Sequence, residues 1–126
     1  MRKVSNATHL GKDGIIYQEF APHQTRESVM RGVELITKAA NLLRKQNKHI
    51  LILGDLSGVL SSTYEARREG AKLLRKIEAD KAAYFGANTF FKYLVKFIIK
   101  ASGLDNKVKY FDTKEDALSW LKRDYE

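Results

Sequence analysis

Apolar and polar positions alternate along the chain with two different periods, which predict strands and helices. Short apolar or β-branched runs between turn residues predict five strands, at 3–9, 14–20, 50–53, 82–85 and 108–111. Longer stretches with apolar residues three and four positions apart predict four amphipathic helices, at about 25–45, 63–78, 89–102 and after Thr113. The run Ile50–Leu53 is uninterrupted, which is typical of a parallel strand buried on both faces.

Local signals indicate where these elements begin and turn. The sequence Gly-Lys-Asp-Gly at 11–14 predicts that the first two strands form a hairpin. Thr25, Asn88 and Thr113 each precede a helix that they can cap. The sequence Ser-Thr-Tyr-Glu at 62–65 fits a capping box, so Ser62 is the predicted N-cap of the second helix.

The element order ββαβαβαβα predicts one α/β domain over residues 1–126. The last three strands each lead into a helix, which favours right-handed parallel crossovers and a mixed, mostly parallel central sheet with flanking helices. The chain has no cysteine, which excludes disulfides and thiolate zinc sites and fits a reducing cytoplasm. Charged and polar residues interrupt the longest apolar stretch, at 82–99, so we predict no transmembrane segment.

Polar residues follow three of the predicted parallel strands. If those strands are neighbours, their carboxyl ends form one edge of the sheet, where ligands and partners bind in open α/β folds. The residues concerned are Asp55, Ser57, Gly86, Asn88 and Asp112. The alternative is that each residue only completes a turn or caps a helix.

The third predicted helix is unusually apolar. Its aromatic residues are Phe90, Phe91, Tyr93 and Phe97, and its charged residues form a lysine stripe at spacing four. One interpretation is that part of this helix stays uncovered and forms a homodimer face, a groove for an apolar ligand or a membrane-surface contact. The other is that the helix is deeply buried and only the lysine stripe meets water.

The sequence offers little for catalysis. His9, His23 and His49 lie on different elements without metal-ligand spacing, and no Ser-His-Asp set is indicated. A carboxylate pair formed by Asp55 and Asp112 is the strongest catalytic alternative. We therefore predict a protein that is not an enzyme and that uses no cofactor and no metal.

Three segments together resemble the STAS superfamily of sulfate-transporter and anti-sigma-factor-antagonist domains, and its SpoIIAA-like (STAS/SEC14-like) branch in particular. They are Ile-Leu-Ile-Leu-Gly-Asp-Leu-Ser-Gly at 50–58, Ala-Tyr-Phe-Gly-Ala at 83–87, and Lys-Tyr-Phe-Asp-Thr-Lys-Glu-Asp-Ala-Leu-Ser-Trp-Leu at 109–121. The resemblance covers nearly the whole chain. It implies a small cytosolic α/β domain that binds partners, and its SEC14-like side implies lipid-like ligands.

The resemblance also directs attention to the hydroxyls before the second helix. In the anti-sigma antagonists, a kinase phosphorylates a hydroxyl at this place, within the motif Asp-Ser/Thr-Ser-Gly. Here the sequence reads Leu-Ser-Ser-Thr-Tyr at 60–64, which keeps the hydroxyls but lacks the flanking Asp and Gly. Ser61, Ser62 and Thr63 are therefore candidate phosphoacceptors, with a purely structural capping role as the alternative.

Three functional hypotheses follow. The leading one is a cytosolic regulatory module that binds a protein partner, for example an anti-sigma-type kinase, or a small ligand at the loop after the central strand. The second is a carrier of a lipid-like apolar molecule near the third helix. The third is a nucleic-acid-binding surface, suggested by the net charge of +8, although no basic run exceeds two residues and we rank it below a protein partner.

Overall fold

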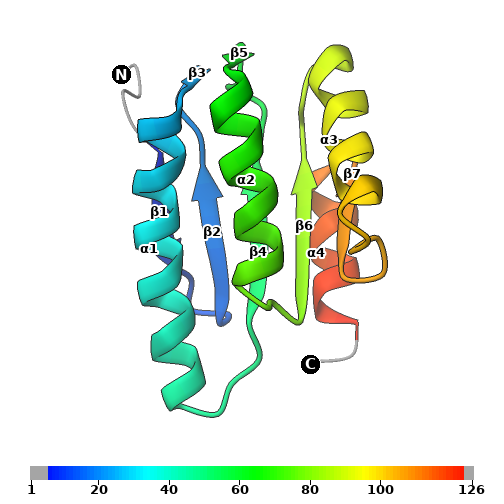
Figure 1. The fold of residues 1–126 in the computed structure, drawn as a ribbon. Coiled ribbons are helices and arrows are strands. Elements are labelled where there is room, and N and C mark those ends of the chain that lie inside the picture. The colour runs from blue at the N-terminus through cyan, green and yellow to red at the C-terminus, as the bar shows by residue number, and fades with distance from the viewer. Residues whose placement is uncertain (1–5, 124–126) are drawn as a thin grey trace.

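The computed structural model describes residues 6–123, which form a central five-stranded sheet in the order β1-β2-β4-β6-β7 (Figure 1). These strands span Ala7–Leu10, Ile15–Glu19, Leu51–Asp55, Lys81–Phe85 and Val108–Phe111. The helices α1 to α4 span Arg26–Lys45, Tyr64–Lys76, Thr89–Ala101 and Lys114–Lys122. A short second sheet pairs β3, His23–Gln24, with β5, Ser61–Ser62.

The sheet is mixed and mostly parallel, as predicted. β1 and β2 form the expected antiparallel hairpin, in which Leu10 pairs with Ile16, while β2, β4, β6 and β7 run parallel to one another. Residues 3–5 of the first predicted strand lie outside the described residues. The α/β architecture and the element order of the main sheet are confirmed. The short β3–β5 sheet was not predicted, because no periodic pattern in the sequence indicated it.

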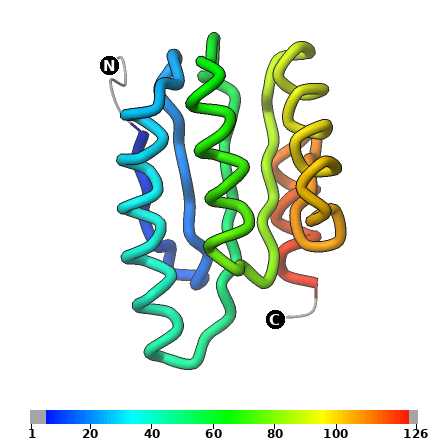
Figure 2. The backbone as a smooth tube through the Cα atoms, viewed as in Figure 1, coloured from blue at the N-terminus to red at the C-terminus, as the bar shows by residue number. Residues whose placement is uncertain are grey.

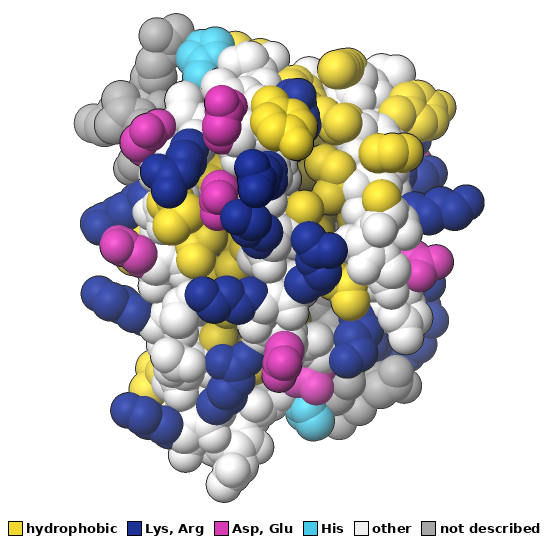
Figure 3. Space-filling model, viewed as in Figure 1, with side chains coloured by type: hydrophobic (Ala, Val, Ile, Leu, Met, Phe, Trp, Pro, Cys, Tyr) yellow, Lys and Arg dark blue, Asp and Glu magenta, His cyan; other side chains and the backbone are white. Residues whose placement is uncertain are grey.

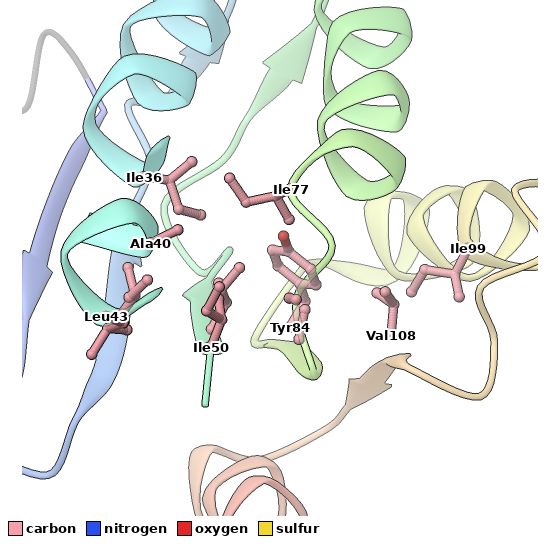
Figure 4. Close-up of a cluster of buried hydrophobic side chains, with 12 residues drawn as sticks. Ile36, Ala40, Leu43, Ile50, Ile77, Tyr84, Ile99 and Val108 are labelled. Carbon is pink, nitrogen blue, oxygen red and sulfur yellow. The ribbon is translucent and has the colours of Figure 1, made fainter. Parts of the chain in front are cut away.

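The helices form two layers around the sheet (Figures 1 and 2). α1, α2 and α3 cover one face, and α4 packs on the other face against β4, β6 and β7. Alternate residues of β4 therefore enter different cores: Ile52 joins the cluster beneath the three helices (Figure 4), and Leu51 and Leu53 join the cluster beneath α4. This confirms that β4 is buried on both faces.

The starts of three helices match the prediction, and one does not. Thr25, Asn88 and Thr113 accept hydrogen bonds from backbone N–H groups in the first turns of α1, α3 and α4. The predicted cap Ser62 is wrong, because Thr63 is the N-cap of α2 and accepts from the N–H of Ala66 at 3.1 Å. Ser62 instead pairs with Gln24 in the short sheet, which keeps its backbone extended one residue longer than the capping-box pattern implied.

Within residues 6–123, no helix has both the length and the apolar character needed to cross a bilayer.

Candidate functional site

The carboxyl ends of β4, β6 and β7 lie at one edge of the sheet, as the sequence predicted, and three of the candidate residues meet there. The Asp55 carboxylate accepts a hydrogen bond from the backbone N–H of Ser57 at 2.9 Å. Gly86 adopts a positive φ of 84°, and a Cβ at this position would approach Ser57 Cβ to 3.3 Å and Asp55 Oδ1 to 3.5 Å. Glycine thus allows the loops after β4 and β6 to pack closely.

The other two residues predicted for this edge have structural partners. Asn88 caps α3 by accepting from the N–H of Phe91 at 3.0 Å. Asp112 forms an ion pair with Lys92 at 2.8 Å, and this ammonium group lowers the pKa of the Asp112 carboxyl. Strand β6 separates β4, which ends at Asp55, from β7, which precedes Asp112. Asp55 thus contacts the backbone of Ser57 and Asp112 contacts Lys92, so the two carboxylates have different partners.

The three candidate phosphoacceptors occupy different environments at the beginning of α2. The Ser61 hydroxyl lies 2.7 Å from His23 Nδ1, and the Thr63 hydroxyl caps the helix. The Ser62 hydroxyl accepts from the guanidinium of Arg67 at 3.1 Å, and the same guanidinium donates to the Ser62 carbonyl. Ser62 is therefore the hydroxyl that already has a cation beside it.

Helix α3 is partly uncovered, which contradicts the alternative of a deeply buried helix. Phe90, Tyr93 and Phe97 are 62%, 64% and 69% exposed, and only Ile99 of α3 is fully buried. The three exposed rings are spaced three and four residues apart and so form one stripe along the helix. Phe91, the fourth predicted residue, is half-buried and faces the space between α3 and α2.

The exposed apolar surface continues around the end of the sheet where α2 and α3 begin. Leu60 and Tyr64 are 64% and 67% exposed there. Figure 3 shows hydrophobic side chains gathered over this end and extending as a strip between α2 and α3. We call the surface formed by Leu60, Tyr64, Phe90, Tyr93 and Phe97 the apolar end surface.

A cavity of about 160 Å³ lies beneath that strip, between the helices and the sheet. Most of its wall is apolar: Leu73 and Leu74 come from α2, and Val95 and Ile98 come from α3. Leu73 and Leu74 are only partly buried, since they border the cavity while they pack against the main core cluster.

Two polar residues at the cavity were not among the predicted site residues. Gln18, Gly54 and Tyr84 lie in one row across β2, β4 and β6, and both Gln18 and Tyr84 line the cavity. Gln18 lies between Ile16 and Phe20 on the inward-facing positions of its strand, so a polar residue in an apolar alternation was the available signal. Burial raises the pKa of the Tyr84 hydroxyl to about 12, so it remains a hydrogen-bond donor at neutral pH.

Among residues 6–123, no cluster of three or more His, Cys, Asp or Glu side chains could hold a metal ion. His49 lies 3.8 Å from Asp80, at the opposite end of β4 from Asp55, and His9 stacks on Tyr17.

A family model described as Domain of unknown function (DUF7793) matches residues 10–124. A comparison with curated proteins finds no match.

Several solved structures share the fold. An uncharacterised protein of the DUF3478 family with a SpoIIAA-like fold, from Shewanella loihica PV-4, matches with a TM-score of 0.67 and 20% identity over 93% of each chain. An anti-sigma-factor antagonist (STAS) domain protein from Planctomyces limnophilus matches with a TM-score of 0.59 and 15% identity, over 94% of this chain and 98% of that one.

The structure of SLC26A9 also matches, with a TM-score of 0.59 and 15% identity. That match covers 89% of this chain but only 20% of SLC26A9, so the similarity concerns one part of a much longer protein. Together these similarities confirm the predicted SpoIIAA-like, STAS-type fold. At 15–20% identity they concern the fold alone.

Proposed function

The chain belongs to the family described as a domain of unknown function, DUF7793, and we propose that it is a non-catalytic regulatory module that binds another protein through the apolar end surface. The observation that carries this proposal is the exposure of Leu60, Tyr64 and Phe90, each above 60%, around the loops that follow β4 and β6. Large exposed apolar side chains that lie together are typical of interaction sites. The fold shared with an anti-sigma-factor antagonist domain supports the same class of function.

The charges beside this surface indicate the chemistry of the partner. Helix α2 carries five basic residues and two acidic ones: Arg67, Arg68, Lys72, Arg75 and Lys76 against Glu65 and Glu69. Figure 3 shows the basic side chains next to the apolar strip. We expect the partner to present an apolar centre flanked by acidic side chains, because such a surface would complement both features.

We further propose that phosphorylation of the hydroxyls before α2 regulates this binding. A phosphate on Ser62 would lie beside the Arg67 guanidinium and near the N-terminus of α2, and both would stabilise its negative charge. The same charge would stand close to Leu60 and Tyr64 and would disfavour an acidic partner. Ser61 and Thr63 are the alternative acceptors.

Capture of a partner tests the binding function. The full chain, immobilised through a terminal tag, is exposed to lysate of the source organism, and retained proteins are quantified by mass spectrometry. A variant carrying Tyr64→Ser and Phe90→Ser should lose the partner, because both apolar contacts are removed from the centre of the surface. Leu42→Ser is the matched control, since Leu42 is 48% exposed but lies near the far end of α1.

The captured protein is then purified and titrated against all three chains. We expect at least a tenfold weaker affinity for the double variant, unchanged affinity for Leu42→Ser, and equal melting temperatures. Equal affinity of the double variant and the wild-type chain would contradict the assignment of the surface.

The regulatory part has its own test. The chain is co-expressed with candidate kinases from the same organism, and its intact mass is measured. One added phosphate that disappears in Ser62→Ala is the expected result, together with weaker binding of the captured partner. If no kinase phosphorylates any of residues 61–63, the switch is wrong while the binding function still stands.

A further inference from the structure

The cavity beneath α2 and α3 is lined by two polar side chains with groups that find no hydrogen-bond partner among residues 6–123. Gln18 is only 4% exposed, and its Oε1 atom accepts no hydrogen bond from this part of the chain. Tyr84 is 8% exposed, and its hydroxyl forms no hydrogen bond with any of residues 6–123. Buried polar groups in folded proteins are nearly always paired, so two unpaired groups on one cavity wall are unusual.

Other polar groups at the same cavity show what a satisfied arrangement looks like. The side-chain amides of Asn6 and Gln24 pair reciprocally, with both N···O distances at 2.9 Å. Asn6 also accepts from the N–H of Ala21, and Gln24 donates to the carbonyl of Ala21. These amides stabilise the chain near β3. Gln18 Oε1 and the Tyr84 hydroxyl form no comparable hydrogen bonds among residues 6–123.

The geometry of the sheet places the two unpaired groups on the same inner surface. Gln18 and Tyr84 flank Gly54 in register, and the Tyr84 ring lies over Gly54, where a Cβ would be 2.5 Å from Tyr84 Cε1. Figure 4 shows the Tyr84 hydroxyl on the side of the sheet that the three helices cover. Both side chains line the cavity on its sheet side. Gln18 Oε1 itself has almost no accessible surface, so the side-chain amide must rotate to present this oxygen to a bound molecule.

We propose that this cavity binds a compact, mostly apolar molecule with one neutral hydroxyl group, of the class of simple phenols and short-chain alcohols. The size fits, because a cavity of about 150 Å³ is enough for one benzene-sized molecule, and this one measures about 160 Å³. The hydroxyl of the ligand would donate to Gln18 Oε1 and accept from the Tyr84 O–H. Its apolar body would contact Leu73, Leu74 and Val95.

The polar pair selects for a neutral group over a carboxylate. An ionised carboxylate has no proton to donate, so it would leave Gln18 Oε1 unpaired and would lose its own hydration. Arg67, the cation that lines the cavity, already donates to Ser62. This ligand site does not depend on the protein partner proposed above. The sequence suggested a lipid-like ligand near α3, and the ligand proposed here is a much smaller molecule.

Three probes of similar size test the proposal on the full chain: p-cresol, toluene and p-toluate. They share a methyl-substituted ring and differ in carrying a hydroxyl, no polar group or a carboxylate. Dissociation constants are measured by titration of ¹⁵N-labelled protein, with the amide signals of Gly54 and the Gln18 side chain as reporters. We expect p-cresol to bind at least ten times more tightly than toluene and p-toluate.

Substitutions at the polar pair test the roles of the two groups. Gln18→Met keeps the length of the side chain but removes the acceptor, so it should abolish the preference for p-cresol over toluene. Tyr84→Phe should reduce that preference by removing one donor. Retention of the full preference in both variants would overturn the assignment of Gln18 and Tyr84.

A substitution in the cavity wall tests the location. Gly70 lines the cavity, and a Cβ there would meet no atom within 4 Å, so larger side chains can project into the space. Gly70→Leu should weaken all probes by at least tenfold, and Gly70→Ala, which adds a single methyl group, should weaken them less. Absence of p-cresol binding to the wild-type chain would overturn the site, and tighter binding of p-toluate would overturn the neutral head group.

Discussion

Gly54 shows how a single residue shapes the inner surface of this protein. It follows three large apolar residues of β4, and the ring of Tyr84 occupies the space that a side chain at position 54 would fill. The Phe20 ring is the next neighbour, at 3.3 Å from the place that a Cβ would take. The consequence is that Tyr84 lies across the sheet toward Gln18 and its hydroxyl stays away from solvent.

Gly54→Ala should therefore destabilise the fold. The added methyl group would overlap Cδ1 and Cε1 of a buried aromatic ring, which cannot flex aside as the tip of a long side chain could, and overpacking of this kind costs about 1–3 kcal/mol. Urea unfolding followed by circular dichroism measures the change in the free energy of unfolding. Gly58→Ala is the control: its Cβ would lie 3.5 Å from the Phe20 carbonyl, and we expect a change within about 0.5 kcal/mol.

Among the elements, the start of α2 separates what sequence patterns can predict from what they cannot. The periodic pattern predicted the helix and its polar face, and the hydroxyl cluster indicated an approximate beginning. The true cap depends on β5, because the pairing of Ser61 and Ser62 with His23 and Gln24 extends the chain through Ser62. That pairing joins segments distant in the sequence, so no local pattern could indicate it.

Thr63→Ala should lower the free energy of unfolding by about 1 kcal/mol, because it leaves the N–H of Ala66 without its side-chain acceptor. Ser62→Ala should cost less, since the Ser62 hydroxyl contacts Arg67 and caps no helix. The two variants are compared by thermal and urea unfolding under the same conditions. A larger loss in Ser62→Ala would restore Ser62 as the cap and contradict the structure.

Helix α3 illustrates a second limit of sequence patterns. Its composition predicted either a buried helix or an exposed apolar stripe, and periodicity alone could not decide, because almost every face of the helix carries a large apolar residue. Tertiary packing determines which face of α3 is exposed. One side of α3 packs against β7 and lines the cavity, and no further element within residues 6–123 covers Phe90, Tyr93 and Phe97.

In the molecule as a whole, the layers of the fold bring the two proposed sites to one region. The parallel strands β4 and β6 direct their carboxyl ends and the following helices to the same end, so the loops after them and the starts of α2 and α3 lie together (Figure 1). The sequence predicted this edge from strand order. The sequence also raised a groove for an apolar ligand at the third helix as one alternative, but it did not place the cavity between α2, α3 and the sheet, because that space depends on tertiary packing.

The candidate residues differ in how far the sequence alone could predict their positions. Asp55, Ser57 and Gly86 could be predicted because each follows a recognisable buried strand. Asp112 was predicted at the right edge, but its ion pair with Lys92 needed the structure, because the two residues come from different elements. Gln18 and Tyr84 are single residues within strands, and only the register between β2, β4 and β6 places them in one row.

The end of the sheet where α2 and α3 begin is the proposed binding surface for the protein partner. Hydrogen–deuterium exchange of the full chain, alone and with the captured partner, shows directly which segments the partner covers. We predict slower exchange on binding in peptides that cover 56–66 and 86–97, with the α4 peptides unchanged. Protection confined to α4 or to the β1–β2 hairpin, with 56–66 and 86–97 unaffected, would contradict this assignment.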